Sequence, residues 1–272
     1  MKLGISSYAF TWAIGVSGYE ADNRQVRLSS EGLLRKAARL GVSVVQIADN
    51  LPLSGLSDRQ LAELLLMARN LDISIEVGSR GLDELSGYLD LCNRFRSPLL
   101  RLVIDTDSHH PTEDEIIRKF KAYMPAFEQA GVILAVENHE RFTAIQFRRI
   151  IEAVSSQNIG ICLDTVNSFG ALEGPDVVLN LLGPFVVNLH IKDFTIYRPA
   201  HNMGFIVAGR PAGQGKLDVP WLLDRLEGEG RNPNVILELW VPPEATVGQT
   251  IAKEQRWAEA SILYLRDLIP DW

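Results

Sequence analysis

The stretch Gln129–Glu137, QAGVILAVE, joins the end of an amphipathic helix to an apolar strand through one glycine. The same order recurs at Arg39–Ile47 (RLGVSVVQI), and at Asn70–Val77 (NLDISIEV) a short turn without glycine joins the helix end to the strand. A glycine directly after the last helical residue is typical of a helix C-terminus. Strands that are apolar at nearly every position are typical of parallel sheets covered on both faces. These junctions therefore predict a chain built from repeated strand and helix units.

Eight segments along the chain have the character of such strands. They are Leu3–Ser7, Ser43–Ile47, Ser74–Val77, Leu99–Ile104, Ile133–Glu137, Gly160–Asp164, Val186–Ile191 and Val235–Leu239. Strict alternation of eight strands with helices favours a closed (β/α)8 barrel, the TIM barrel, over an open doubly wound sheet.

Helical spacing of apolar residues fills the intervals between these strands. The predicted helices include Ser30–Leu40, Asp58–Leu71, Asp83–Phe95, Glu113–Ala130, Ala144–Val154 and Ile251–Leu268. No linker or low-complexity segment divides the 272 residues, a length that suits one barrel. We therefore expect a single domain, residues 1–272, of the α/β class.

Composition and charge exclude several classes of function. The net charge of −7 and the pI of about 5.3 argue against a nucleic-acid-binding face. The apolar runs are too short for a membrane helix, and the N-terminus lacks the layout of a signal peptide. Cys92 and Cys162 stand in apolar surroundings and are expected to be reduced packing residues. A cytoplasmic protein that contacts neither membrane nor nucleic acid is the expectation.

Polar residues end four consecutive predicted strands, Glu137, Asp164, His190 and Glu238. The first two intervals are 27 and 26 residues, each one repeat, and the third is 48 residues because a long loop follows the seventh strand. Equal phase on neighbouring strands brings the four side chains to one level at the mouth of the barrel. Burying unpaired carboxylates is costly, and a shared cation removes that cost. Mixed oxygen and nitrogen ligands predict a divalent metal site for Mn²⁺, Co²⁺, Mg²⁺ or Zn²⁺.

Five segments, in order, carry a resemblance to the sugar phosphate isomerase/epimerase family, the xylose isomerase-like TIM barrels. They are AVENH (Ala135–His139), CLDTVNS (Cys162–Ser168), NLHIKD (Asn188–Asp193), AGQGKLD (Ala212–Asp218) and ILELW (Ile236–Trp240). The resemblance implies the same four metal ligands and isomerase or epimerase chemistry on a small keto-sugar or sugar phosphate. It also implies pairing of barrels into dimers or tetramers.

A second group of residues is predicted to contact the substrate, namely His139, Asn167, Lys192, Arg198, Arg210 and Trp12. Arg141 follows His139 in the same loop, and Asp193 is expected to orient a neighbour. Asn167 departs from the resemblance, because epimerases of that family often place a histidine there. The long loop at residues 195–215 should overhang the mouth, where its glycines are consistent with a lid.

For the reaction, we expect Glu137 and Glu238 to act as the proton carriers on opposite faces of a metal-stabilised cis-enediolate. Proton return to the same carbon gives epimerisation, and return to the adjacent carbon gives aldose–ketose isomerisation. The same scaffold allows a dehydratase (lyase) of an inosose or dehydroshikimate-like ring. A non-catalytic sugar-binding barrel and an abasic-site endonuclease are further alternatives, the latter disfavoured by five histidines and the acidic charge.

Overall fold

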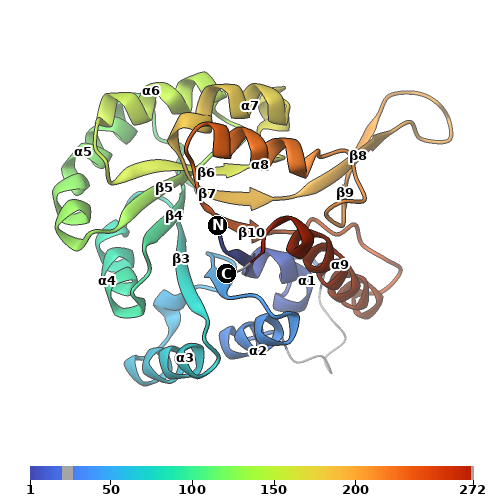
Figure 1. Ribbon diagram of the computed structural model, residues 1–272, viewed down its shortest axis with the longest axis horizontal. Coiled ribbons are helices and arrows are strands. Elements are labelled where there is room, and N and C mark those ends of the chain that lie inside the picture. The colour runs from blue at the N-terminus through green and yellow to red at the C-terminus, as the bar shows by residue number, and fades with distance from the viewer. Residues whose placement is uncertain (20–26, 271–272) are drawn as a thin grey trace.

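The computed structural model describes residues 1–19 and 27–270, and eight parallel strands within them close into a barrel. The order around the barrel is β1-β10-β7-β6-β5-β4-β3-β2 (Figure 1). The strands are β1 (Leu3–Ser6), β2 (Val44–Ile47), β3 (Ser74–Arg80), β4 (Leu99–Val103), β5 (Ile133–Glu137), β6 (Ile159–Asp164), β7 (Val186–Ile191) and β10 (Asn234–Leu237). The predicted TIM barrel is confirmed.

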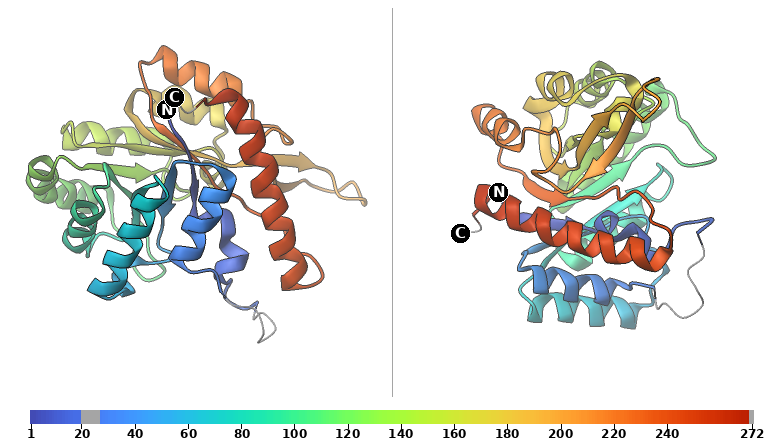
Figure 2. Two further views of the ribbon diagram at one scale, coloured as in Figure 1. Left: turned by 60° about the horizontal axis from the view of Figure 1, so that its bottom comes forward. Right: turned by 90° about the vertical axis from the view of Figure 1, so that its right-hand side faces the viewer.

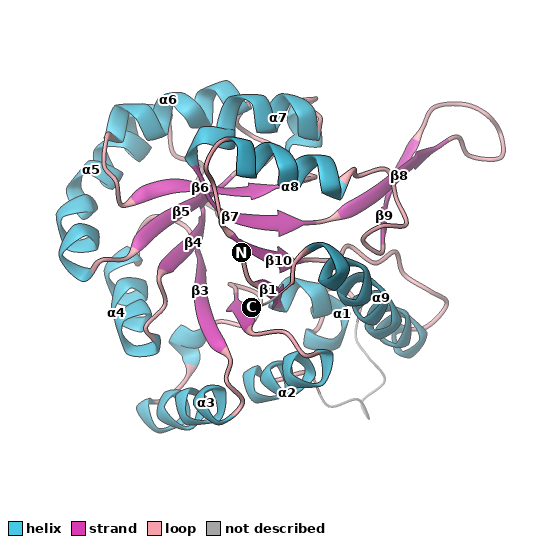
Figure 3. Ribbon diagram, in the orientation of Figure 1, coloured by secondary structure: helices cyan, strands magenta, loops and turns pink. Residues whose placement is uncertain are grey.

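Helices surround the barrel on its outside (Figures 2 and 3). They are α1 (Thr11–Ile14), α2 (Ser30–Leu40), α3 (Asp58–Asn70), α4 (Leu85–Phe95), α5 (Glu113–Ala130), α6 (Ala144–Val154), α7 (Pro175–Leu182), α8 (Val219–Gly228) and α9 (Val247–Leu268), with short 3-10 turns η1 (Ser7–Phe10), η2 (Leu53–Gly55), η3 (Asn167–Ala171) and η4 (Gly183–Phe185). Gly131 ends α5 in the left-handed conformation (φ 66°), so the glycine of the QAGVILAVE junction closes that helix as predicted.

One segment differs from the sequence expectation. Residues 195–215 were expected to form an irregular loop, but the structure has an antiparallel hairpin there, β8 (Asp193–Tyr197) and β9 (Ile206–Arg210). The hairpin pairs with no strand of the barrel and projects from its side (Figure 1). Each strand has only five residues, too few for their alternation to stand out in the sequence.

The inside and the outside of the barrel wall differ in chemistry. The main apolar core lies between strands and helices and includes Val45, Ile47, Val77 and Leu134, all buried. The interior contains buried polar residues instead, among them Gln46 and Glu76 and the residues of the site described below. An interior of this kind is costly unless each polar group is paired, so its contacts are functionally informative.

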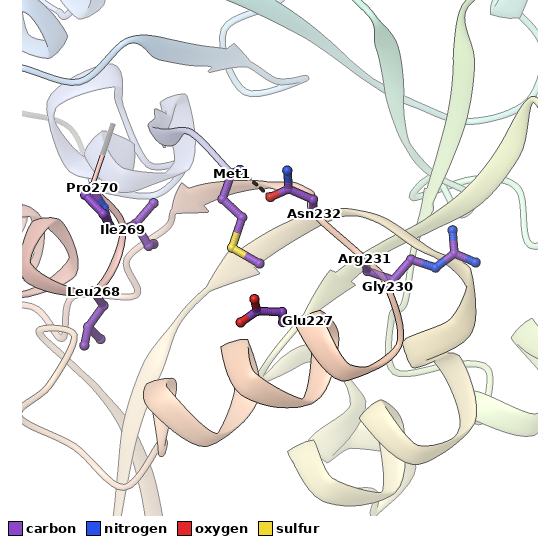
Figure 4. Close-up of a pocket in the computed structure, with 8 residues that line it drawn as sticks. All are labelled: Met1, Glu227, Gly230, Arg231, Asn232, Leu268, Ile269 and Pro270. Carbon is purple, nitrogen blue, oxygen red and sulfur yellow. Dashed lines mark hydrogen bonds between the residues drawn. The ribbon is translucent and has the colours of Figure 1, made fainter. Parts of the chain in front are cut away.

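The N-terminal end of the barrel is closed by contacts between distant parts of the chain. Met1 and Asn232 are hydrogen-bonded there, beside a cavity of about 760 Å³ that Glu227, Arg231 and Pro270 also line (Figure 4). This face lies opposite the strand ends that carry the candidate site. None of the described helices combines the length and the apolar character needed to cross a membrane.

Candidate metal centre

The four predicted ligands meet at the carboxyl ends of neighbouring strands. Glu137 and Asp164 are the last residues of β5 and β6, and His190 lies in β7 level with Asp164. Glu238 directly follows β10, and its backbone N–H donates to Ile191 O at 3.1 Å, which extends the ladder by one residue. All four are at most 1% exposed. The structure therefore brings them together inside the barrel.

Three carboxylates face one ring nitrogen of His190. His190 Nδ1 lies 3.4 Å from Glu137 Oε2, 3.4 Å from Glu238 Oε1 and 3.8 Å from Asp164 Oδ2. Ligand atoms about 2.1 Å from one tetrahedral ion stand about 3.4 Å apart. Ligand atoms of Asp164, His190 and Glu238 all lie within 4.8 Å of one another, so these three are spaced for a shared ion, and Glu137 reaches the group through its contact with His190.

The other ring nitrogen of His190 fixes its protonation. His190 Nε2 lies 2.8 Å from Gln46 Oε1. The amide nitrogen of Gln46 donates to Glu76 and to Asn188, each at 3.1 Å, so its oxygen must be the atom that faces the histidine. Because that oxygen only accepts, Nε2 carries a proton, and Nδ1 is the nitrogen that faces the carboxylates. An ion bound among these groups would take the lone pair of Nδ1.

A metal ion fits this donor set. Among the described residues, His190 Nδ1 and Glu238 Oε1 are buried without any hydrogen-bond partner. Such orphaned atoms are rare in native interiors and are expected where an ion belongs. Cys162 Sγ also lies within 4.8 Å of Glu137 and His190 ligand atoms, but it is engaged with Asn188 Oδ1 at 3.4 Å. Burial raises the pKa of the Cys162 thiol well above its usual range.

A polar network beneath the site supports His190. Glu76 accepts hydrogen bonds from Gln46, from Asn188 at 3.0 Å and from Asn234 at 2.8 Å. Burial raises the pKa of Glu76 even against these three hydrogen bonds. Gln46 and Glu76 were not predicted from the sequence as functional residues, although both interrupt otherwise apolar strands, and that interruption was the available signal.

Two buried cations flank the carboxylates. Lys192 Nζ lies 2.9 Å from both Asp164 Oδ2 and Glu238 Oε2. Arg101, on β4, donates from Nε to Glu137 and from its Nη1 to Asp49 at 2.9 Å. Burial lowers the pKa of Lys192, but the nearby carboxylates outweigh burial and raise it, so both side chains are charged. Lys192 was predicted from the sequence as a substrate contact, whereas Arg101 was missed.

Arg101 is held in turn by a shared carboxylate at the mouth. Asp49 accepts from Arg101, from Arg80 Nε at 2.8 Å and from the Tyr8 hydroxyl at 3.0 Å. Burial and the negative charge of Asp49 raise the pKa of Tyr8 to about 12, so it remains a hydrogen-bond donor. The chain Glu137–Arg101–Asp49–Arg80 thus links the metal site to the rim.

Three of the other predicted substrate contacts lie near the mouth. Asn167 donates to Glu137 Oε1 at 2.8 Å and accepts from Lys192 at 3.3 Å. His139 lines a cavity of about 300 Å³ with Arg80 and Arg141, next to the end of β5. Trp12 donates from its ring to Val241 O at 2.9 Å and is partly buried in the wall.

The remaining two, Arg198 and Arg210, lie on the β8–β9 hairpin and are exposed. Arg198 donates to Asn202 O at 3.0 Å, and its guanidinium carbon lies 4.5 Å from the centre of the Phe205 ring. Neither arginine makes a contact with the four ligands.

Asp193 has a structural task at the root of the hairpin. Its carboxylate accepts backbone hydrogen bonds from Phe194, Gly213, Gly215 and Leu217, at 2.7 to 3.0 Å. A Cβ on Gly215 would collide with this carboxylate, which explains the glycine. Asp193 therefore orients the glycine-containing loop rather than a metal ligand.

The chain is similar to known proteins in both sequence and fold. A family model described as xylose isomerase-like TIM barrel matches residues 13–268. A curated relative, 3-oxo-isoapionate decarboxylase of Pectobacterium atrosepticum, is 34% identical over 268 residues, which covers 97% of this chain and 95% of the relative.

Solved structures share the fold at lower sequence identity. D-psicose 3-epimerase of Clostridium cellulolyticum, solved with D-tagatose, matches with a TM-score of 0.72 and 20% identity over 100% of both chains. A xylose isomerase-like barrel of Mycobacterium smegmatis, solved in complex with magnesium, matches with a TM-score of 0.69 and 13% identity over 97% of both chains.

Proposed function

The chain belongs to the xylose isomerase-like TIM-barrel family, and on that premise we propose that it is a divalent-metal-dependent decarboxylase of a small 3-oxo sugar acid. The observation that carries the proposal is the pair of buried cations, Arg101 and Lys192, beside the metal site. A divalent ion, Arg101 and Lys192 together exceed the charge of Glu137, Asp164 and Glu238 by one positive unit. A site with surplus positive charge suits an anionic substrate and an anionic intermediate.

The chemistry of a 3-oxo acid matches these groups. Its ketone stands two carbons from the carboxyl carbon, so cleavage of the C1–C2 bond releases CO2 and leaves the electron pair as an enolate across C2 and C3. A hydroxyl on C2 makes this species an enediolate, which is the intermediate expected for isomerases as well. The two reactions therefore differ in the bond that breaks, C–C or C–H, and share the anion that must be stabilised.

Each side chain then has a stated task. Glu137, Asp164, His190 and Glu238 would hold the ion, and a bound divalent ion supplies positive charge that stabilises an enolate oxygen. Asn167 and Arg101 each donate to one oxygen of Glu137 and so fix its orientation.

Lys192 is suited to supply the proton that C2 needs after CO2 has left. Its side chain is 14% exposed, whereas the four ligands are fully buried, so Lys192 is the more accessible group at the site. Its backbone is fixed by Thr165, which accepts from Lys192 N at 2.9 Å and donates to Lys192 O at 2.8 Å. We propose Lys192 as the acid that protonates C2, a role that requires its two carboxylate partners, Asp164 and Glu238, to be neutralised by a bound ion so that its pKa falls.

The curated relative adds independent support for the reaction. It is named a 3-oxo-isoapionate decarboxylase, and the match extends over nearly the whole of both chains. We propose that this chain acts on a branched or linear 3-oxo sugar acid of similar size.

Isomerisation or epimerisation of a keto-sugar or sugar phosphate is the second candidate. One observation favours it: Glu137 and Glu238 stand on either side of His190, each 3.4 Å from Nδ1, as two proton carriers for opposite faces of a cis-enediolate would. Against it, both oxygens of Glu137 already accept hydrogen bonds, from Arg101 and Asn167, which weakens Glu137 as a base. Dehydration of a ring substrate would use the same enolate and expel hydroxide.

The experiment compares the two reactions on one metal-loaded sample. The protein is freed of metal with a chelator, reloaded with Mn²⁺, Mg²⁺ or Zn²⁺, and supplied with four- and five-carbon 3-oxo sugar acids generated in place by oxidation. We expect metal-dependent CO2 release above the spontaneous rate and, in D2O, one deuterium at C2 of the product. A panel of ketoses in D2O is the parallel arm. Exchange of a ketose proton without CO2 release from any acid would refute the decarboxylase and favour the epimerase.

A further inference from the structure

A layer of polar side chains crosses the barrel interior beneath the candidate metal centre. Gln46 and Glu76 lie level with each other on β2 and β3, and Asn188 and Asn234 lie level on β7 and β10. Gln46, Glu76 and Asn188 are 0% exposed. An amide group can be turned by half a turn with little change of shape. Its orientation is therefore set by a neighbour whose role as donor or acceptor is fixed.

Glu76 is that neighbour. Among the residues that the structure describes, each hydrogen bond to its carboxylate comes from an amide N–H. Gln46 Nε2 and Asn188 Nδ2 donate to Oε2 at 3.1 and 3.0 Å, and Asn234 Nδ2 donates to Oε1 at 2.8 Å. Asn234 is fixed independently, because its oxygen accepts from the backbone N–H of Lys2 at 3.2 Å, and a backbone N–H only donates. Both oxygens of Glu76 are therefore acceptors, and the amide nitrogens of the layer face them.

The orientation of Gln46 decides which nitrogen of His190 is left for an ion. With its nitrogen toward Glu76 and toward Asn188 Oδ1, each at 3.1 Å, Gln46 presents its oxygen to His190 Nε2 at 2.8 Å. That oxygen requires a proton on Nε2, so Nδ1 is the nitrogen that can bind an ion. A turned Gln46 would present its N–H2 group instead. Nε2 would then have to accept, the ring proton would move to Nδ1, and Nδ1 could bind no ion.

We propose that Glu76 is a positioning residue, which acts through Gln46 to make His190 present Nδ1 to a bound ion. Within the described part of the chain, the hydrogen bonds of Glu76 go to three amides and to none of the four candidate ligands. Its effect on the metal centre therefore passes through Gln46. The consequence for metal affinity rests on the proposed metal-dependent function, whereas the consequence for the imidazole does not.

A double-mutant cycle on metal affinity distinguishes this role from a merely structural one. Glu76→Met keeps the length of the side chain and removes both acceptors. Competition with a chromogenic chelator gives the dissociation constant of Mn²⁺ for the purified chain. We expect Glu76→Met to weaken Mn²⁺ binding by about 10-fold in the parent. In the Gln46→Ala background it should weaken binding by less than about twofold, because the contact through which Glu76 acts is already missing.

Two further variants complete the comparison. Glu76→Gln leaves one oxygen for three amide nitrogens, so at least one amide has to turn, and the loss of affinity should be smaller but equally dependent on Gln46. Ser79→Ala is the matched control, since Ser79 is buried on the same strand and its hydroxyl has no hydrogen-bond partner among the described residues. Circular dichroism and thermal unfolding verify that each variant is folded. An equal loss with and without Gln46, or no loss in either Glu76 variant, would overturn the proposal.

The imidazole of His190 gives a second measurement, which needs neither metal nor substrate. His190 is the one fully buried histidine of the five, so in metal-free protein labelled with 15N-histidine its Nε2–H should give the slowly exchanging ring N–H signal in NMR spectra. The signal should be kept in Ser79→Ala and lost in Gln46→Ala and Glu76→Met. A parental signal in Glu76→Met would overturn the proposal. Loss of the signal as expected, in a parent chain that binds no divalent ion, would uphold the positioning role and refute the metal-dependent function.

Discussion

His190 Nε2 lies 2.8 Å from Gln46 Oε1, across the barrel interior and 144 residues away in the chain. This contact decides which nitrogen of His190 faces Glu137, Asp164 and Glu238. It also ties the candidate metal centre to the Glu76 network on the neighbouring strand. The polar interior of this barrel is thus a support for the site, and its effect can be measured separately from catalysis.

Replacing Gln46 should weaken metal binding while the four ligands remain in place. In Gln46→Ala the imidazole loses the acceptor that fixes its tautomer and ring orientation, and such supporting contacts are worth about 10- to 100-fold in affinity. Competition with a chromogenic chelator gives the dissociation constant. Gln157→Ala, at an exposed glutamine in the turn between α6 and β6, is the matched control. Equal affinity in Gln46→Ala and the parent would contradict this role.

Removing either glutamate from the ligand set should abolish both metal retention and turnover. Glu137→Gln and Glu238→Gln keep the shape of the side chain and remove the charge, so the barrel should fold and the ion should bind poorly. We expect turnover to fall by about 100-fold or more and metal content per chain, measured by mass spectrometry, to drop in parallel. Glu259→Gln, at an exposed glutamate on α9, should retain both. A double variant that carries both Glu137→Gln and Glu238→Gln and still turns over substrate would refute the site.

The strand-end residues could be predicted from the sequence because their placement depends only on their position at the end of an apolar strand. Glu137 and Asp164 each end an apolar strand, and parallel strands place such ends at one edge whatever surrounds them. The closed barrel followed from the same alternation. No contact across the barrel was needed for either inference.

The supporting residues could not be predicted, because their roles depend on contacts between strands far apart in the chain. Gln46 and Arg101 are ordinary polar positions until closure of the barrel places them beside His190 and Glu137. The hairpin was missed for a different reason. Its two strands are held in place by the contacts of Asp193 and by each other. The turn residues between them interrupt the alternation of apolar and polar residues by which strands are predicted.

Lys192 should contribute through its proton as well as its charge. Lys192→Met removes both, so the rate of CO2 release should fall by about 100- to 10,000-fold and KM for an anionic substrate should rise. Lys192→Arg retains the charge but does not release a proton near neutral pH, so KM should remain close to that of the parent while kcat falls. Lys121→Met, at an exposed lysine on α5, is the control. A Lys192→Arg enzyme with the parental kcat would exclude Lys192 as the acid.

Asp193 should matter for the stability of the root and not for metal binding. Asp193→Asn replaces a carboxylate that accepts four backbone hydrogen bonds with an amide whose N–H2 group faces other donors. We expect a loss on the order of 3 kcal/mol in the free energy of unfolding. Limited proteolysis should cut the variant between residues 198 and 218. Metal content should stay at the parental value, as in the exposed control Asp224→Asn; loss of metal in Asp193→Asn alone would show that Asp193 orients a ligand.

Glu254 should make the stability of the fold depend on pH. This buried residue of α9 accepts backbone hydrogen bonds from Trp12 at 2.8 Å and Ala13 at 3.1 Å. Burial raises the pKa of Glu254 from 4.5 to about 7, and neither the two backbone hydrogen bonds nor the charge of Lys36 reverses this.

The sign follows from the protons bound in each state. Between pH 4.5 and 7 the unfolded chain has lost the Glu254 proton and the folded chain has kept it, so stability falls as pH rises through this range and levels off above it. The whole effect is about 3 kcal/mol. Urea titrations at pH 5 and pH 8 give the free energy of unfolding of each protein. The difference between Glu254→Gln and the parent should be larger at pH 8 than at pH 5, in favour of the variant, by about this amount. Glu259→Gln, on the exposed face of the same helix, should show no such gain, and parallel pH profiles for all three proteins would contradict the assignment.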